Sequence, residues 1–151
     1  AVLDAQVIWE IYTLRAAFEG LAARILAERR DLLGLDQVVA AFASLTVAQD
    51  ADTGARVAAD LGFHASFVRQ TGHQHLIRRH GMLADKMEWL YRWSESHWPC
   101  RNPLLGEHQP LFDALTGGTP DQAERAVRDH IDYSITQDVA GFHSLATGEK
   151  T

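Results

Sequence analysis

The sequence is poor in cysteine and in cationic residues, and it has no long apolar run. Its 151 residues include one cysteine, Cys100, so no disulfide can form within the chain, which favours a cytoplasmic protein in a reducing environment. No apolar stretch approaches the length that spans a bilayer, so no contact with a membrane is expected. The net charge of −6 is the opposite of the basic excess that a nucleic-acid-binding surface needs. If the protein acts on DNA, another segment must contact it.

Patterns typical of β structure, linkers and repeats are also missing. There are no alternating apolar and polar segments between hairpin turns, no low-complexity linker and no internal repeat. The chain begins at Ala1 without methionine and without a signal-peptide pattern, so we expect it to be part of a longer protein. What is present, 46% hydrophobic and 23% charged residues, is typical of a globular domain. We therefore predict one all-α domain over residues 1–151, an antiparallel helical bundle of about six helices.

Helical spacing and capping residues place the six helices. The first carries an apolar stripe at steps of three and four, formed by Val7, Ile11, Leu14, Phe18, Leu21 and Ile25. The clearest boundary is Thr119–Gln122, a capping box with proline in the first turn. Asp36 and Asn102 are expected to cap two other helices. The predicted helices run from 4 to 30, from 36 to 48–50, from 52 or 53 to 71, from 76 to 98, from 103 to 117, and from 120 through 134.

Asp60 and His64 are the first candidate metal ligands. They are four residues apart, so on a helix their side chains lie one turn apart on the same face and can bind one ion together. They share this face with Val57, Leu61 and Val68, which indicates that the face points inward.

His108 and His130 are predicted to point into the same core from two other helices. Their partners in helical register are mostly apolar or small: Leu104, Leu111 and Leu115 for the first, and Ala123, Val127 and Ser134 for the second. Imidazole nitrogens and a carboxylate oxygen suit zinc, nickel, iron or manganese, and four such ligands can leave coordination positions open. We therefore predict one divalent metal on Asp60, His64, His108 and His130, with zinc preferred over nickel, manganese or iron.

The alternative for each histidine is an ordinary residue held by hydrogen bonds, the more common role of a histidine in a helix. Four such groups on inward faces would each need a separate buried partner, which favours a shared ion. The remaining histidines do not share this register and are expected to be surface or capping residues: His73, His75, His80, His97 and His143. We expect His108→Ala and His130→Ala to weaken metal binding and His80→Ala to leave it unchanged.

Arg15 is the candidate effector-binding residue. It lies beside Ile11 and Phe18 on the first helix, with Glu19 one turn further on, so it can reach the edge of the core while pairing locally. A surface arginine whose stem follows the apolar stripe is the alternative. If Arg15 faces the metal cavity, it would recognise a carboxylate together with an open metal position, because guanidinium binds that group through two hydrogen bonds. The predicted ligand is then a small organic acid.

Four parts of the sequence resemble the FCD domain, the effector-binding half of FadR-type regulators in the GntR family. They are Ile11–Arg15 with Glu19, Asp60–His64, Glu107–His108 and Arg128–Ile131, and the resemblance spans essentially the whole chain. Metal-binding members have an aspartate and a histidine four apart and two later histidines, which map here to Asp60, His64, His108 and His130.

The resemblance also maps the family's arginine–glutamate pair to Arg15 and Glu19. The chain departs from the family at His73, where an asparagine commonly caps the following helix, so that cap is in question. The implied role is the sensing domain of a bacterial transcription regulator, which catalyses no reaction, forms a homodimer in the intact protein, and controls a winged helix-turn-helix domain that is not in this chain.

Two other functions remain open. A helical metal-dependent hydrolase would use Glu107 or Asp129 as a general base towards metal-bound water. Neighbours on a helix point about 100° apart, however, so we expect neither carboxylate to share the cavity of the ligands. A structural metal, or none, in a domain that only dimerises is the third hypothesis, and it would leave buried polar groups poorly compensated.

Overall fold

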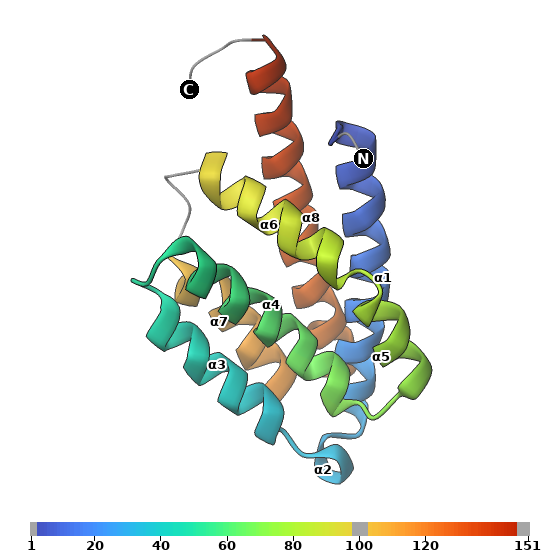
Figure 1. Cartoon of the computed structure of the whole chain (residues 1–151). Helices are drawn as coiled ribbons and strands as arrows, with labels where there is room; N and C mark the ends of the chain where they lie inside the picture. The colour runs from blue at the N-terminus through green and yellow to red at the C-terminus, as the bar shows by residue number, and fades with distance from the viewer. Residues whose placement is uncertain (1–2, 98–102, 148–151) are drawn as a thin grey trace.

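The computed structural model describes residues 3–97 and 103–147, and within these ranges it contains eight helices and no strand (Figure 1). The helices are α1 (Ala5–Glu28), α2 (Arg30–Leu33), α3 (Asp36–Ala48), α4 (Thr53–Gln70), α5 (Gln74–Gly81), α6 (Ala84–His97), α7 (Leu104–Gly117) and α8 (Pro120–Thr147). The all-α prediction is confirmed. In the described ranges, no helix has the length and apolar character needed to cross a bilayer.

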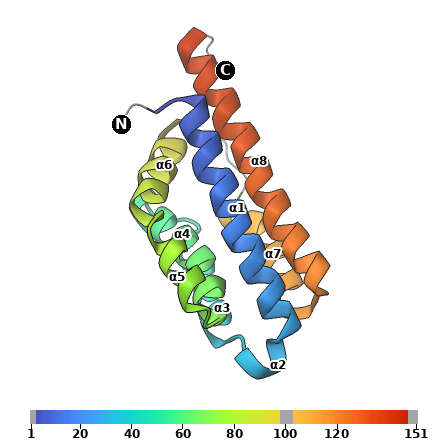
Figure 2. The same cartoon turned by 90° about the vertical axis from the view of Figure 1, so that its right-hand side faces the viewer.

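The long helices α1 and α8 form an antiparallel pair along one side of the bundle (Figure 2). Helix α4 packs against α1, α3, α5 and α6, while α7 contacts α8, α3 and α1. The three helices that carry the predicted ligands, α4, α7 and α8, therefore all face the interior beside α1.

Local caps set three of the six predicted helix starts. Asp4 and Asp52 each accept a hydrogen bond from the backbone N–H three residues further on, both at 2.8 Å. The capping box of α8 is confirmed: the Gln122 N–H donates to Thr119 Oγ1 at 3.2 Å, and the Thr119 N–H donates to Gln122 Oε1 at 2.9 Å. The predicted Asn102 cap and the predicted stop near residue 98 lie outside the described residues.

Helix α3 begins differently from the prediction. Asp36 is its first residue and does not cap it; its Oδ1 accepts a hydrogen bond from Gln70 Nε2 at 3.0 Å instead. The Oε1 atom of Gln70 accepts from the Gln37 N–H at 2.8 Å, and its Nε2 also donates to the Leu33 carbonyl at 2.9 Å. A side chain from the end of α4 thus supplies the cap, and no local sequence pattern indicates such a partner.

The predicted long fourth helix is wrong, because it divides into α5 and α6 at Met82–Leu83. Gly81 is a weak helix former, and the Leu83 N–H donates to the His80 carbonyl at 3.0 Å, a tighter bond that ends the α-helical pattern. Apolar residues keep helical spacing across the break, so periodicity could not reveal it. The break lets α5 contact α1 and α6 pack against α4. The other unpredicted helix, α2, is a single turn.

The buried face of α1 also differs from the predicted apolar stripe. Leu14 and Leu21 are 45% and 42% exposed, whereas Arg15 and Glu19 are 1% and 0% exposed. Apolar and small residues surround this pair on the inward face: Ile8, Ile11, Tyr12, Ala16, Ala22, Ala23 and Leu26. Pattern reasoning places charged residues outside, but two opposite charges that pair can be buried together.

Candidate functional site

The structure brings the four predicted ligands into one cluster, which we call the Asp–His cluster: Asp60 and His64 from α4, His108 from α7 and His130 from α8. His108 Nε2 lies 2.9 Å from Asp60 Oδ1 and 3.1 Å from His64 Nε2. The same Asp60 oxygen is 3.4 Å from His64 Nε2. The His130 ring lies 5.2 Å from the His64 ring and 4.8 Å from the His108 ring, measured between centroids.

Hydrogen bonds that point away from the cluster fix the protons on two of the rings. His64 Nδ1 is 2.6 Å from Glu19 Oε1, and His108 Nδ1 is 2.8 Å from the Leu104 carbonyl oxygen. Because a carboxylate and a carbonyl only accept, both Nδ1 atoms carry a hydrogen and donate it. In the neutral rings both Nε2 atoms then carry lone pairs, and both lie beside Asp60 Oδ1. Three acceptor atoms thus converge with no donor among them.

The spacing of these acceptors fits a transition metal. Two ligands about 2.1 Å from one ion, at tetrahedral to octahedral angles, lie about 3.0 to 3.4 Å apart. The separations of 2.9, 3.1 and 3.4 Å between Asp60, His64 and His108 are close to this range. His130 borders the three acceptors under a looser limit, since one nitrogen from each of His64, His108 and His130 lies within 4.8 Å of the others.

Charges within the cluster shift its pKa values. Burial disfavours the charged forms of Asp60 and His108, but the attraction between them outweighs it, so the pKa of Asp60 is well below its usual value and the pKa of His108 is raised. Burial, with repulsion from His108 and His64, lowers the pKa of His130 well below its usual value. The cluster therefore contains an ionised Asp60 and a neutral His130. A proton competes with a metal ion for the Nε2 atom of His108.

Arg15 and Glu19 extend the cluster along α1. Glu19 Oε1 accepts from His64, and Glu19 Oε2 pairs with Arg15 Nε. Burial opposes the charge of Glu19, but Arg15 and His64 lower its pKa to about 2, so it stays ionised. The terminal Nη1 and Nη2 atoms of Arg15 are buried without a hydrogen-bond partner among the described residues. Arg15 is thus a buried residue with two donors still to be satisfied, not a surface arginine.

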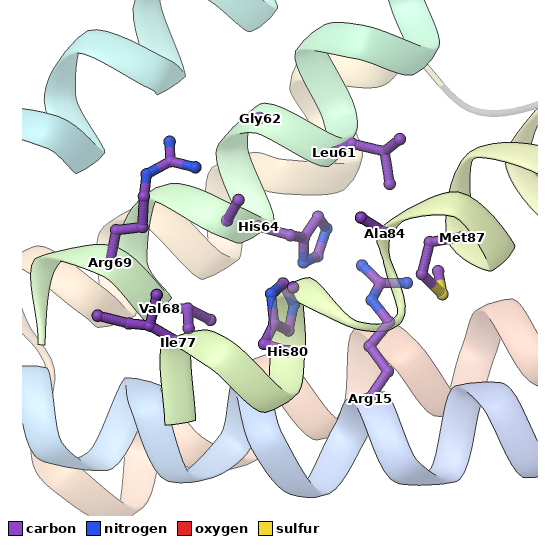
Figure 3. A pocket seen from close by; sticks show the side chains of 12 residues that line it. Arg15, Leu61, Gly62, His64, Val68, Arg69, Ile77, His80, Ala84 and Met87 are labelled. Atoms are coloured by element: carbon purple, nitrogen blue, oxygen red, sulfur yellow. The ribbon is translucent and has the colours of Figure 1, made fainter. Parts of the chain in front are cut away.

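A cavity of about 320 Å³ adjoins both Arg15 and His64 (Figure 3). We call it the acid pocket. Its apolar wall comes from α4, α5 and α6, and includes Leu61, Ala65, Val68, Ile77, Ala84 and Met87. Its polar residues are Arg15, His64, Arg69 and His80. Figure 3 shows the Arg15 guanidinium and the rings of His64 and His80 directed towards one another. An apolar wall with a few convergent polar groups is typical of a small-molecule site.

The prediction that His80 is a surface or capping residue is wrong. Its side chain is 16% exposed, and its Nε2 lies 3.9 Å from Glu19 Oε1. Burial lowers the pKa of His80 despite the attraction of Glu19. One sequence signal could have found it: His80 lies four residues after Leu76, the buried residue of α5.

The other histidines of the predicted surface group behave as expected. His75, His97 and His143 are exposed. His73 Nδ1 accepts a hydrogen bond from the Leu76 N–H at 3.2 Å and caps α5. The cap that was in question is therefore made, with histidine in place of asparagine.

A second pocket, of about 430 Å³, lies on the α7–α8 side of the cluster. We call it the acidic pocket after its two carboxylate residues, Glu107 and Asp129, and it is a different cavity from the acid pocket beside Arg15. Its lining residues are Glu107, Pro110, Leu111, Ala126, Asp129, His130 and Tyr133. The expectation that neither Glu107 nor Asp129 would share a cavity with a ligand is wrong for His130. The pocket lies between α7 and α8. A groove between two helices is wide enough for adjacent residues such as Asp129 and His130 to line it together, although their side chains point about 100° apart.

Sequence reasoning missed a second buried polar group, the Tyr12–Ser94–Asp138 triad. The Tyr12 hydroxyl donates to Asp138 Oδ2 at 2.7 Å, and Ser94 Oγ donates to Asp138 Oδ1 at 2.8 Å. Burial and the neighbouring Asp138 raise the pKa of Tyr12 well above its usual value, so Tyr12 remains a donor. The triad joins α1, α6 and α8 through residues far apart in sequence, which gives it no local signature.

Comparisons with known proteins agree with this architecture. The FCD domain family matches residues 10–133. The solved structure of a metal-free FCD domain, from a protein described as a transcriptional regulator, has a TM-score of 0.74 at 14% identity and covers 95% of this chain and 99% of that chain. At this identity the likeness concerns the fold alone.

A curated relative is also similar in sequence. The "probable D-xylose utilization operon transcriptional repressor" of Paenarthrobacter nicotinovorans is 29% identical over 123 residues, which are 81% of this chain and 54% of that protein. The chain therefore spans about half the length of this curated relative.

Proposed function

Because the chain belongs to the FCD domain family, we propose that it is the effector-sensing domain of a bacterial transcription regulator of the GntR family, FadR subfamily. In this proposal the Asp–His cluster holds one divalent transition metal, and a small organic acid binds between that metal and Arg15. The name of the curated relative as a repressor supports a regulatory role. Family membership favours this role over that of a helical hydrolase.

The observation that carries the metal proposal is the convergence of three acceptor atoms, Asp60 Oδ1 and the Nε2 atoms of His64 and His108. Buried acceptors that face one another are unfavourable unless a cation or proton lies between them. Glu19 and the Leu104 carbonyl hold the two rings in place, as partners of metal-binding histidines commonly do. The donor set favours zinc over nickel, manganese or iron. A bound metal would supply an open, electron-accepting position for the carboxylate of an acid.

The organic-acid proposal rests on Arg15. Its Nη1 and Nη2 atoms are buried donors without a protein partner among the described residues, and Arg15 lines the acid pocket. A carboxylate accepts two parallel hydrogen bonds from such a fork. Glu19 holds the guanidinium through Nε and leaves the outer edge of the fork for a ligand. The apolar wall would contact the remainder of a small acid.

A molecule bound in the acid pocket would contact four helices, because α1, α4, α5 and α6 all line it. An acid that prefers one arrangement of these helices shifts the population of that arrangement. We propose that the shift acts on an attached winged helix-turn-helix domain in a homodimer. The greater length of the curated relative is consistent with an additional domain.

Metal content tests the first half of the proposal. Protein without a histidine tag is incubated with zinc, desalted and examined by elemental analysis; we expect about one ion per chain. The His64→Ala variant, tested in parallel, should retain little. A folded wild-type sample that retains no metal would contradict the proposal.

A thermal-shift screen tests the second half. Small mono- and dicarboxylic acids are added to the zinc-loaded domain, and a true effector raises the melting temperature by mass action. Arg15→Lys keeps a positive charge beside Glu19 but loses the fork, so the shift should largely disappear. Arg92→Lys, on the exposed side of α6, is the matched control and should behave like the wild type. Equal stabilisation of Arg15→Lys and wild type would show that Arg15 does not bind the acid.

A further inference from the structure

Two pockets of opposite charge reach the Asp–His cluster from different sides. The acid pocket contains Arg15 and Arg69 and meets the cluster at His64. The acidic pocket contains Glu107 and Asp129 and meets the cluster at His130. The two pockets share no lining residue.

We propose that the acidic pocket between α7 and α8 is the route by which the metal ion reaches and leaves the Asp–His cluster, while the acid uses the other pocket. This inference rests on the proposed metal function and adds to it a separate path for the cation.

Burial supports this direction of approach. His64 and His108 are 1% and 0% exposed, and Asp60 is 8% exposed. His130 is the partly buried member of the cluster, and it lines the acidic pocket. A cation that arrives through this pocket meets His130 first, and the His130 ring is in turn next to both His64 and His108.

Charge supports the same direction. Glu107 precedes His108 in the chain and lines the acidic pocket. Asp129 precedes His130 on α8 and is exposed. Carboxylates in a cleft raise the local concentration of cations and their rate of association. In the acid pocket a divalent cation would have to pass the Arg69 guanidinium and the Nη1 and Nη2 donors of Arg15, which are unpaired among the described residues. These groups face an anion more favourably than a cation.

The rates of metal uptake and release test the route. Cobalt(II) uptake by the metal-free protein is followed by stopped-flow absorbance, and release is started with excess chelator. In the double variant Glu107→Gln/Asp129→Asn we expect both rates to fall about three- to tenfold, with the dissociation constant nearly unchanged, because the carboxylates act on the passage. Asp113→Asn/Asp132→Asn is the matched control: it changes the same charge on the same helices, and neither residue lines either pocket.

A second variant blocks the pocket without a change of charge. Ala126→Phe adds bulk to the wall of the acidic pocket and should also slow uptake and release together. Its folding is verified by circular dichroism.

Several outcomes would overturn the route. Unchanged rates in both variants, with normal metal affinity, would reject the route and leave the metal site intact. Slower uptake with faster release in the double variant would mean that the carboxylates hold the bound ion instead. Faster uptake in Arg69→Ala alone would place the route in the acid pocket. A wild-type protein that binds no cobalt at equilibrium would reject the proposed function and the route together.

Discussion

Two buried polar groups lie close to Arg15, and they differ in how completely their hydrogen-bond donors and acceptors are paired. In the Tyr12–Ser94–Asp138 triad each carboxylate oxygen accepts from one hydroxyl, so donors and acceptors match. In the Asp–His cluster three acceptors face one another, and Arg15 beside it has two donors without a protein partner among the described residues. The first arrangement stabilises the fold by itself. The second gains most from a ligand, which is why function is expected there.

Substitution of a proposed metal-binding residue should reveal the largest difference between the Asp–His cluster and the triad. His108→Ala should weaken metal binding by roughly 4 kcal/mol, about a thousandfold, if four ligands share the binding free energy of a typical site. His130→Ala should act in the same direction. Isothermal titration calorimetry measures the change, and His75→Ala, exposed on α5, is the control. Similar losses in all three variants would contradict the assignment of the ligands.

A substitution in the triad should lower the unfolding free energy and leave the metal affinity nearly unchanged. Asp138→Leu leaves the Tyr12 and Ser94 hydroxyls without their acceptor, and the metal-free protein should lose about 3 kcal/mol of unfolding free energy. Urea denaturation measures this loss, and metal affinity should stay within about twofold of the wild type. Asp132→Leu, exposed on the same helix, is the control. If Asp138→Leu keeps its stability but loses metal affinity, the triad belongs to the functional site.

Glu19 tests whether the Asp–His cluster extends into α1. Glu19→Gln keeps the size of the side chain but removes the charge that holds His64 and Arg15. We expect metal affinity to fall about ten- to a hundredfold, as for other partners of metal-binding histidines. The exposed Glu28→Gln on the same helix is the control. An unchanged affinity would restrict the site to its four ligands.

The smallest predicted effect is that of pH. The pKa of His108 is raised in the metal-free protein, so below that pKa a metal ion must displace a proton, and its affinity should fall about tenfold per pH unit. His130 has a lowered pKa and releases no proton near neutral pH. Calorimetry in buffers of different ionisation enthalpy should therefore find that metal binding releases a proton from His108 below its raised pKa, and that this release declines at higher pH. Proton release that rises with pH would contradict this assignment.

The sequence predicted those parts of the site that depend on local spacing. The helix starts near residues 4 and 52, the capping box at Thr119, and the inward direction of His108 and His130 follow from neighbours within one or two turns. The contact between Glu19 and His64 could not be predicted, because it joins residues 45 positions apart. The break at Met82–Leu83 could not be predicted either, because the apolar spacing continues through it.

Part of the wall of the acid pocket lies on helices that carry none of the proposed metal ligands. Ile77, Ala84 and Met87 come from α5 and α6, whereas the Asp–His cluster comes from α4, α7 and α8. A substitution at one of these wall positions changes the shape and volume that a ligand meets without touching a metal ligand. Under the proposed function, related sequences could therefore diverge in the acid that they recognise while the metal site is inherited intact, and the specificity of such a sensor could evolve one wall residue at a time.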